Sequence, residues 1–157
     1  MAAKTQKLVV PYLTVSSGTA AIAFYKKGFG AKEVMRMPAQ DKKRLLHAEL
    51  EINGHALYLC DDFSDMMPEH TGGGRTPEKL GGTPCSMFVQ LTAPKEVDQW
   101  MAKAAKAGAK IAMPAADQFW GDRFGQLFDP FGHSWSFGAP LPKVKAKAPA
   151  KKKPKGK

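Results

Sequence analysis

The feature that most constrains the fold of this chain is an internal repeat. Three short motifs of the first half recur 76 to 78 residues later: Gly30-Ala31-Lys32 as Gly108-Ala109-Lys110, Met37-Pro38-Ala39 as Met113-Pro114-Ala115, and Gly54-His55 as Gly132-His133. Both halves also show the same order of elements, namely strand, helix, strand and hairpin. No motif is specific alone, but all share nearly one offset. The repeat therefore predicts a duplicated βαβββ unit and an α+β fold.

The first unit is expected over about residues 7–61. Its elements are a strand over 7–15, a helix that ends near residue 29, a strand over 32–36, and a hairpin of strands over 45–52 and 56–60. Ser16 and Ser17 are typical helix N-cap residues, and Gly30 supplies the C-cap. The pair Asn53-Gly54 favours a two-residue hairpin turn.

The second unit is expected over about residues 85–139. Its elements are a strand over 86–91, a helix capped by Thr92 and ended by Gly108, and a hairpin over 120–137 whose turn contains Asp129, Pro130 and Gly132. In the last strand the aromatic residues Trp135 and Phe137 alternate with two serines. This pattern predicts an apolar face toward a helix and a polar face toward a cavity. Residues 62–84 predict a connecting loop, either a mobile flap beside a site or a plain linker.

The C-terminal segment, residues 140–157, consists mostly of lysine, alanine and proline and is expected to be disordered. Eight lysines lie between Lys143 and Lys157 without an acidic residue, which leaves 16 basic and 14 acidic residues in the rest of the chain. Most of the net charge of +10 therefore belongs to this tail. Such a tail predicts salt-sensitive, non-specific contact with DNA or another polyanion. A solubilising tail without a specific partner is the alternative.

The sequence also predicts a cytoplasmic protein without membrane contact. No apolar run approaches the roughly 20 residues that a membrane helix needs, and no signal-peptide pattern follows the N-terminus. Cys60 and Cys85 belong to no metal or disulfide motif and are expected as reduced thiols.

Four segments carry a family resemblance: residues 10–15 (Val-Pro-Tyr-Leu-Thr-Val), 24–31, 46–50 (Leu-His-Ala-Glu-Leu) and 120–136, which contains Asp-Pro-Phe-Gly-His. Together they resemble the vicinal oxygen chelate superfamily of glyoxalase I, bleomycin-resistance proteins and extradiol dioxygenases, and most closely its PhnB-like branch. The resemblance covers about residues 7–139. It implies one domain over residues 1–139, whose two modules form curved mixed sheets around a cavity, and usually a homodimer.

The resemblance also implies where a divalent metal would be held. Metal-dependent members place histidine, glutamine or glutamate on the first strand of each module and a carboxylate on the last. These positions fall at Val10, Tyr58, Ser86 and Ser136. None of the four supplies a carboxylate or an imidazole, and a shift of one residue gives no better set. No cofactor is therefore expected.

Alternation along the strands predicts which side chains face the cavity. The candidate ligand-binding residues are Tyr12, His47, Glu49, Tyr58, Phe88, Trp120, Arg123 and Ser136. His47 is the best catalytic candidate, because imidazole suits proton transfer near neutral pH, and a structural histidine is the alternative. A metal held by His47 and Glu49 alone would be an incomplete site. Trp120 and Arg123 suit an aromatic or anionic ligand, unless Arg123 pairs with Asp122 or serves a dimer contact.

Three functional hypotheses remain at this point. The leading one is a PhnB-like, bleomycin-resistance-type protein that binds a small organic ligand in a metal-free cavity. The second is a divalent-metal-dependent lyase, isomerase or dioxygenase of the same superfamily. The third is a nucleic-acid-associated protein that acts through the basic tail. The sequence leaves open whether the chain is an enzyme.

Overall fold

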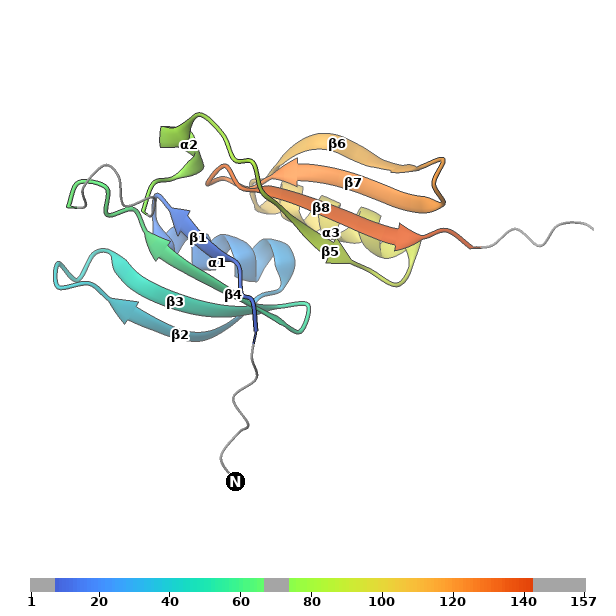
Figure 1. The fold of residues 1–157 in the computed structure, drawn as a ribbon. Helices are drawn as coiled ribbons and strands as arrows, with labels where there is room; N and C mark the ends of the chain where they lie inside the picture. Colours follow the sequence, from blue (N-terminus) through green and yellow to red (C-terminus); the bar gives the residue numbers. More distant parts are fainter. Residues whose placement is uncertain (1–7, 67–73, 143–157) are drawn as a thin grey trace, which may run out of the picture.

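The computed structural model describes residues 8–66 and 74–142, which form two βαβββ modules (Figure 1). The first module contains β1 (Tyr12–Val15), α1 (Gly18–Phe29), β2 (Lys32–Pro38), β3 (Leu45–Ile52) and β4 (His55–Asp61). After the short helix α2 (Pro77–Leu80), the second contains β5 (Ser86–Gln90), α3 (Pro94–Ala107), β6 (Lys110–Asp117), β7 (Asp122–Phe128) and β8 (Ser134–Pro140). From residue 143 onward, the expected basic tail lies outside the described residues.

Each module forms one four-stranded mixed sheet with the same strand order. The orders are β1-β4-β3-β2 and β5-β8-β7-β6. In each sheet the first and last strands of the module run parallel, whereas the other neighbours run antiparallel. This shared topology confirms the duplicated α+β fold that the repeat predicts.

Helix α1 begins and ends where its sequence predicts. The Ser17 Oγ accepts a hydrogen bond from the Ala20 N–H at 3.4 Å, which satisfies one of the free N–H groups of the first turn. Gly30 ends the helix in the left-handed conformation, with φ 67°. Ile22 and Tyr25 are almost completely buried and fix this face of the helix in the core.

Several element boundaries differ from the sequence prediction by one residue or more, among them the end of β2, which includes Pro38, and the starts of β1 and α3. β1 starts only at Tyr12, after Pro11, whose nitrogen carries no hydrogen for a strand ladder. The N-cap of α3 is Ala93 rather than Thr92. The Glu96 carboxylate accepts hydrogen bonds from the backbone N–H groups of Thr92 and Ala93 at 2.8 and 2.9 Å. The Glu96 side chain in the first turn of α3 thus caps the backbone before the helix, whereas the Thr92 side chain was expected to cap the helix itself.

The connecting segment 62–84 contains the helix α2, which the sequence analysis did not predict. Thr76 caps this helix by accepting a hydrogen bond from the Lys79 N–H at 3.4 Å, and Pro77 occupies its first turn, where a missing N–H costs nothing. Within the same segment, residues 67–73 lie outside the described part of the chain.

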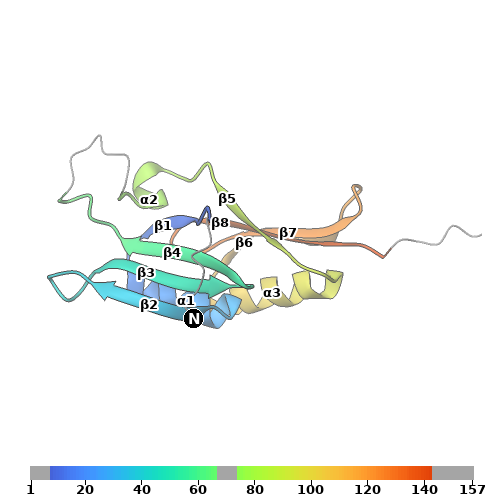
Figure 2. The same ribbon diagram turned by 60° about the horizontal axis from the view of Figure 1, so that its bottom comes forward.

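The two helices α1 and α3 lie on the same side of both sheets and pack against each other (Figures 1 and 2). The contact is close at Gly28, where an added Cβ would lie 3.3 Å from the Cβ of Ala107. One face of each sheet is therefore covered by helices, and the other is open. Within the described residues the two sheets close no barrel. No helix of these ranges is long and apolar enough to cross a membrane.

The alternation in β8 is confirmed. Trp135 and Phe137 are buried on the helix side, where their ring centroids lie 4.7 and 5.7 Å from that of Phe29 in α1. Ser134 and Ser136 point to the opposite face of the sheet. The last strand of the second module thus packs against the helix of the first, which joins the two modules in one core.

A buried carboxylate holds the β7–β8 turn and joins it to α1. The Asp129 carboxylate accepts hydrogen bonds from Tyr25 Oη (2.6 Å), Trp135 Nε1 (2.9 Å) and the backbone N–H groups of Phe131 and His133 (both 2.9 Å). Burial alone would raise the pKa of Asp129, but contacts with His133, Tyr25 and Trp135 outweigh it, so the pKa is lowered. The Asp-Pro-Phe-Gly-His motif is therefore a structural clamp between the modules.

Candidate functional site

Six side chains cover the open face of the first sheet: Tyr12 and Thr14 from β1, His47 and Glu49 from β3, and Tyr58 and Cys60 from β4. They share this face because successive side chains of a strand point to opposite sides. The intervening residues Leu13, Ala48 and Leu59 are buried against the helices. Four of the candidate ligand-binding residues therefore lie together.

Three of these side chains form a hydrogen-bonded chain. Tyr12 Oη lies 2.7 Å from His47 Nδ1, and His47 Nε2 lies 3.2 Å from Glu49 Oε1. The Tyr58 ring packs edge-on against Tyr12 and His47, at centroid distances of 5.9 and 5.0 Å. Burial, together with the neighbouring Cys60 thiol, raises the pKa of Tyr12. Its phenol therefore keeps its proton at neutral pH.

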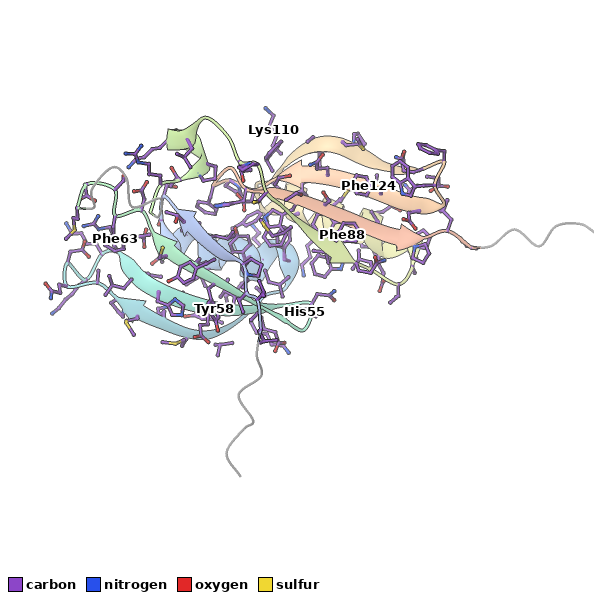
Figure 3. All side chains as sticks on the ribbon, in the orientation of Figure 1. His55, Tyr58, Phe63, Phe88, Lys110 and Phe124 are labelled. Carbon is purple, nitrogen blue, oxygen red and sulfur yellow. The ribbon has the colours of Figure 1, made fainter. Side chains whose placement is uncertain are left out.

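Two phenylalanine side chains of the second sheet, Phe88 in β5 and Phe124 in β7, lie on its open face (labelled in Figure 3). The rings of Phe88 and Phe124 stack with an interplanar angle of 14° and a centroid distance of 6.5 Å. Trp120, in the turn before β7, packs edge-on against Phe124 at 5.9 Å. Phe88 and Trp120 are half exposed, at 53% and 51%. Sequence reasoning missed Phe124 because it placed the adjacent Arg123 on this face, and neighbouring residues of a strand point to opposite faces.

Serine hydroxyls connect this aromatic surface to β8. The Gln126 amide donates to Ser134 Oγ at 3.0 Å, Ser134 Oγ donates to Ser86 Oγ at 3.1 Å, and Ser86 Oγ lies 3.1 Å from Ser136 Oγ. Three hydroxyls supply three hydrogens, and the two contacts among them use two. One hydroxyl hydrogen, on the exposed Ser86 or on the buried Ser136, is therefore not used by these two contacts.

The strand registers show which residues of the two modules are equivalent. Tyr12 pairs with Tyr58 as Phe88 pairs with Ser136. Glu49 lies opposite Tyr58 in the first sheet, and Gln126 lies opposite Ser136 in the second. His47 precedes Glu49 by two residues, as Phe124 precedes Gln126, so His47 and Phe124 are equivalent as well. The equivalent pairs are Tyr12 and Phe88, His47 and Phe124, Glu49 and Gln126, and Tyr58 and Ser136. The first module thus holds ionisable groups where the second holds phenylalanine, glutamine and serine.

A cavity of about 1210 Å³ opens at the end of the first sheet. Its lining includes Tyr12, Thr14 and Cys60 from the strands and Arg44, Phe63 and Arg75 from the loops. The Arg44 guanidinium lies 4.4 Å from the Phe63 ring centroid and pairs with Asp41 and Asp65, both at 2.8 Å. Burial raises the pKa of the Cys60 thiol, so it is a poor nucleophile. The wall of this cavity therefore offers a ligand aromatic rings and groups that form hydrogen bonds.

Arg123 is not part of the open face. The alternation of β7 turns its side chain toward α3, where its guanidinium forms ion pairs with Asp98 and Asp117 at 2.6 and 2.8 Å. These two carboxylates raise its pKa. The neighbouring residue Phe124 occupies the open face instead. The structure thus separates Arg123 from the other candidate ligand-binding residues.

The positions at which metal-dependent relatives hold a divalent ion do not fit one here. Ser86 and Ser136 contact each other through their hydroxyls, and Tyr58 supplies a phenol. Val10 precedes β1 and lines a second cavity of about 590 Å³. Carboxylate, imidazole and thiolate are the donors that such ions need. Across residues 8–66 and 74–142, no three histidine, cysteine, aspartate or glutamate side chains are grouped as a metal site.

Comparison with known proteins agrees with this architecture. The pattern of the glyoxalase/bleomycin resistance protein/dioxygenase superfamily matches residues 7–137. The chain belongs to this superfamily. An uncharacterized protein of Mycobacterium tuberculosis (strain ATCC 25618 / H37Rv) is 42% identical over 145 residues, which cover 92% of this chain and 81% of that protein.

Two solved structures share the fold at low sequence identity. The PhnB protein of Bacillus cereus is 21% identical, with a TM-score of 0.63 over 87% of this chain and 100% of that one. The fosfomycin resistance protein FosX of Listeria monocytogenes, solved with Mn(II) and sulfate, is 15% identical, with a TM-score of 0.62 over 90% and 98%. At these identities the likeness establishes the fold and no ligand.

Proposed function

We propose that this chain is a PhnB-like binding protein for a small organic molecule, which occupies the open sheet faces. The apolar part of the ligand contacts Phe88 and Phe124, and its polar part contacts the Tyr12–His47–Glu49 chain. One observation carries the proposal: equivalent positions hold ionisable groups in one module and aromatic, uncharged groups in the other. Exposed aromatic surface with a few convergent polar groups is typical of ligand sites.

Binding is proposed to need no metal, because Val10, Tyr58, Ser86 and Ser136 offer no carboxylate or imidazole. A lyase, isomerase or dioxygenase of the superfamily's metal-dependent type would need such ligands. Elemental analysis of protein purified without a chelator separates these hypotheses. We expect less than one tenth of an equivalent of nickel, zinc, manganese or iron. One tightly bound ion per chain would contradict the metal-free proposal.

The ligand site is proposed to be completed by a second copy of the chain. Tyr12, Phe88 and Trp120 are about half exposed on faces that no helix or strand within residues 8–66 and 74–142 covers. Apolar patches of this kind commonly mark interaction surfaces. Light scattering at micromolar concentration should give a dimer mass, and Trp120→Asp should shift it toward the monomer. Leu80→Ser, on the separate helix α2, is the control, and a monomeric wild type would refute the proposal.

A thermal-shift screen of small anions, aromatic antibiotics and phosphonates tests ligand binding itself. A ligand present at 100 times its Kd stabilises the native state by about 2.7 kcal/mol. Phe124→Ala should reduce this stabilisation by up to about half, because it deletes half of the stacked aromatic pair and is expected to weaken binding by up to about tenfold. Phe119→Ala, at a side chain that is 98% exposed, should keep it. A shift that is equal in both variants would place the ligand elsewhere.

A further inference from the structure

We infer that Tyr12 is a fixed hydrogen-bond acceptor in this site and selects ligands that present an O–H or N–H donor. This inference rests on the proposed function, because it assigns a specificity to the same site. It depends on the directions of the hydrogen bonds in the Tyr12–His47–Glu49 chain, which follow from the chemistry of its three members.

The direction is set at Glu49. An ionised carboxylate can only accept hydrogen bonds, so the His47 Nε2 atom, 3.2 Å from Glu49 Oε1, must carry the hydrogen. In a neutral imidazole the other nitrogen is then an acceptor. Glu49 therefore selects the tautomer in which His47 Nδ1 has a free lone pair.

The next step fixes the Tyr12 hydroxyl. His47 Nδ1 lies 2.7 Å from Tyr12 Oη, and this acceptor takes the only hydrogen that the phenol has. Tyr12 Oη also lies 3.5 Å from the Leu46 carbonyl, which is likewise an acceptor. Its further polar neighbour is the Cys60 thiol, a weak donor and acceptor that also contacts Thr14 Oγ1 at 3.9 Å. The Tyr12 hydrogen is therefore committed to the protein, and only oxygen lone pairs remain for a ligand.

Tyr12 is also the member of this chain that lines the cavity of about 1210 Å³. Its side chain is 52% exposed, so a ligand can reach the oxygen. Thr14 and Cys60 line the same cavity, but the hydrogen of their hydroxyl or thiol group can rotate. Each of these two groups can therefore either donate a hydrogen bond to a ligand or accept one from it. Tyr12 differs because its direction is fixed by two further residues.

The consequence is a preference between ligands of the same shape. A ligand with a donor completes the chain, whereas an analogue without one leaves the Tyr12 oxygen desolvated and without a partner. A hydrogen bond lost in this way corresponds to about a tenfold loss of affinity. The ligand class is therefore a small organic molecule that carries an O–H or N–H group next to an apolar ring.

Calorimetric titration with two matched probes tests this preference. The probes are para-cresol and para-methylanisole, which replaces its O–H by O–CH₃. Both are titrated at about pH 8, which lies below the pKa of an ordinary phenol and above that of an ordinary imidazole. Wild type should bind the phenol about tenfold more tightly than the anisole. Tyr12→Phe should bind both with similar affinity. Tyr58→Phe, which removes a neighbouring hydroxyl outside the chain, should keep the preference.

The outcomes separate this inference from the proposed function. Equal affinities in wild type, or a preference that persists in Tyr12→Phe, would overturn the inference and leave the binding proposal standing. Failure of both probes to bind wild type would contradict the proposed site, and with it the inference. Nitrogen-15 NMR of His47 gives a ligand-free result: we expect hydrogen on Nε2, and an Nδ1–H tautomer would overturn the inference.

Discussion

Replacing Asp129 by alanine should remove a large share of the stability of the fold. The carboxylate accepts hydrogen bonds from Tyr25 Oη, Trp135 Nε1 and two backbone N–H groups, and its side chain is fully buried. Each donor left without a partner costs about 1–3 kcal/mol, and partial relaxation of the turn reduces the sum. We expect a loss of about 3–5 kcal/mol from a total of about 5–15 kcal/mol.

Urea unfolding followed by tryptophan fluorescence measures this loss, because Trp135 itself contacts Asp129. Tyr25→Phe removes one of the four donors and should cost about 1–2 kcal/mol. Asp117→Ala, which breaks an exposed pair with Arg123, is the control and should leave the midpoint almost unchanged. A loss below about 1 kcal/mol in Asp129→Ala would refute the clamp.

The lowered pKa of Asp129 adds a pH dependence to this prediction. A carboxylate whose folded pKa is depressed contributes stability above its unfolded pKa, and this contribution is lost as the pH falls through the folded value. Wild type should therefore lose stability as the pH falls below about 4. Asp129→Asn should show a smaller slope there. An equal slope in both proteins would show that other carboxylates account for the acid sensitivity.

Two further predictions concern the first module and the tail. Gly18→Ala should destabilise the fold by about 1–3 kcal/mol in the same urea assay. The reason is that the new Cβ would lie 2.7 Å from the buried Asp61 carboxylate and 2.9 Å from Leu45. An unchanged midpoint would mean that Asp61 and Leu45 move away from the new methyl group without cost. Deletion of residues 141–157, which carry eight lysines, should abolish retention on immobilised DNA at low salt. Retention by the truncated protein would show that the nearly neutral body binds DNA.

The fold could be predicted from the sequence because the same turn and helix-end residues occur in both halves of the chain. Asn53-Gly54 and Gly132 specify hairpin turns, while Gly30 and Gly108 end helices in both halves. These are short-range effects of backbone conformation, which a sequence shows directly. The packing of α1 against α3 could not be predicted in this way, because it depends on contacts such as that of Gly28 with Ala107.

The candidate site was predictable in part. Alternation along β3 and β4 correctly grouped His47, Glu49 and Tyr58, because one residue in two shares a face. The same rule fails when the register is off by one residue, as in β7, where Arg123 was expected at the site and Phe124 lies there. The hydrogen-bonded chain from Tyr12 to Glu49 depends on which strands are neighbours, and β1 is not paired with β3 in the sheet. No local pattern reveals such a contact.

The most direct test of the proposed binding site is a calorimetric titration of para-cresol into chelator-treated protein, with Phe124→Ala measured beside wild type. A metal-free site on the open faces predicts saturable binding by wild type and a roughly two- to tenfold weaker affinity in Phe124→Ala, since a stacked aromatic contact contributes about 0.5–1.5 kcal/mol. Binding that appears only after a divalent metal is added would contradict the proposal.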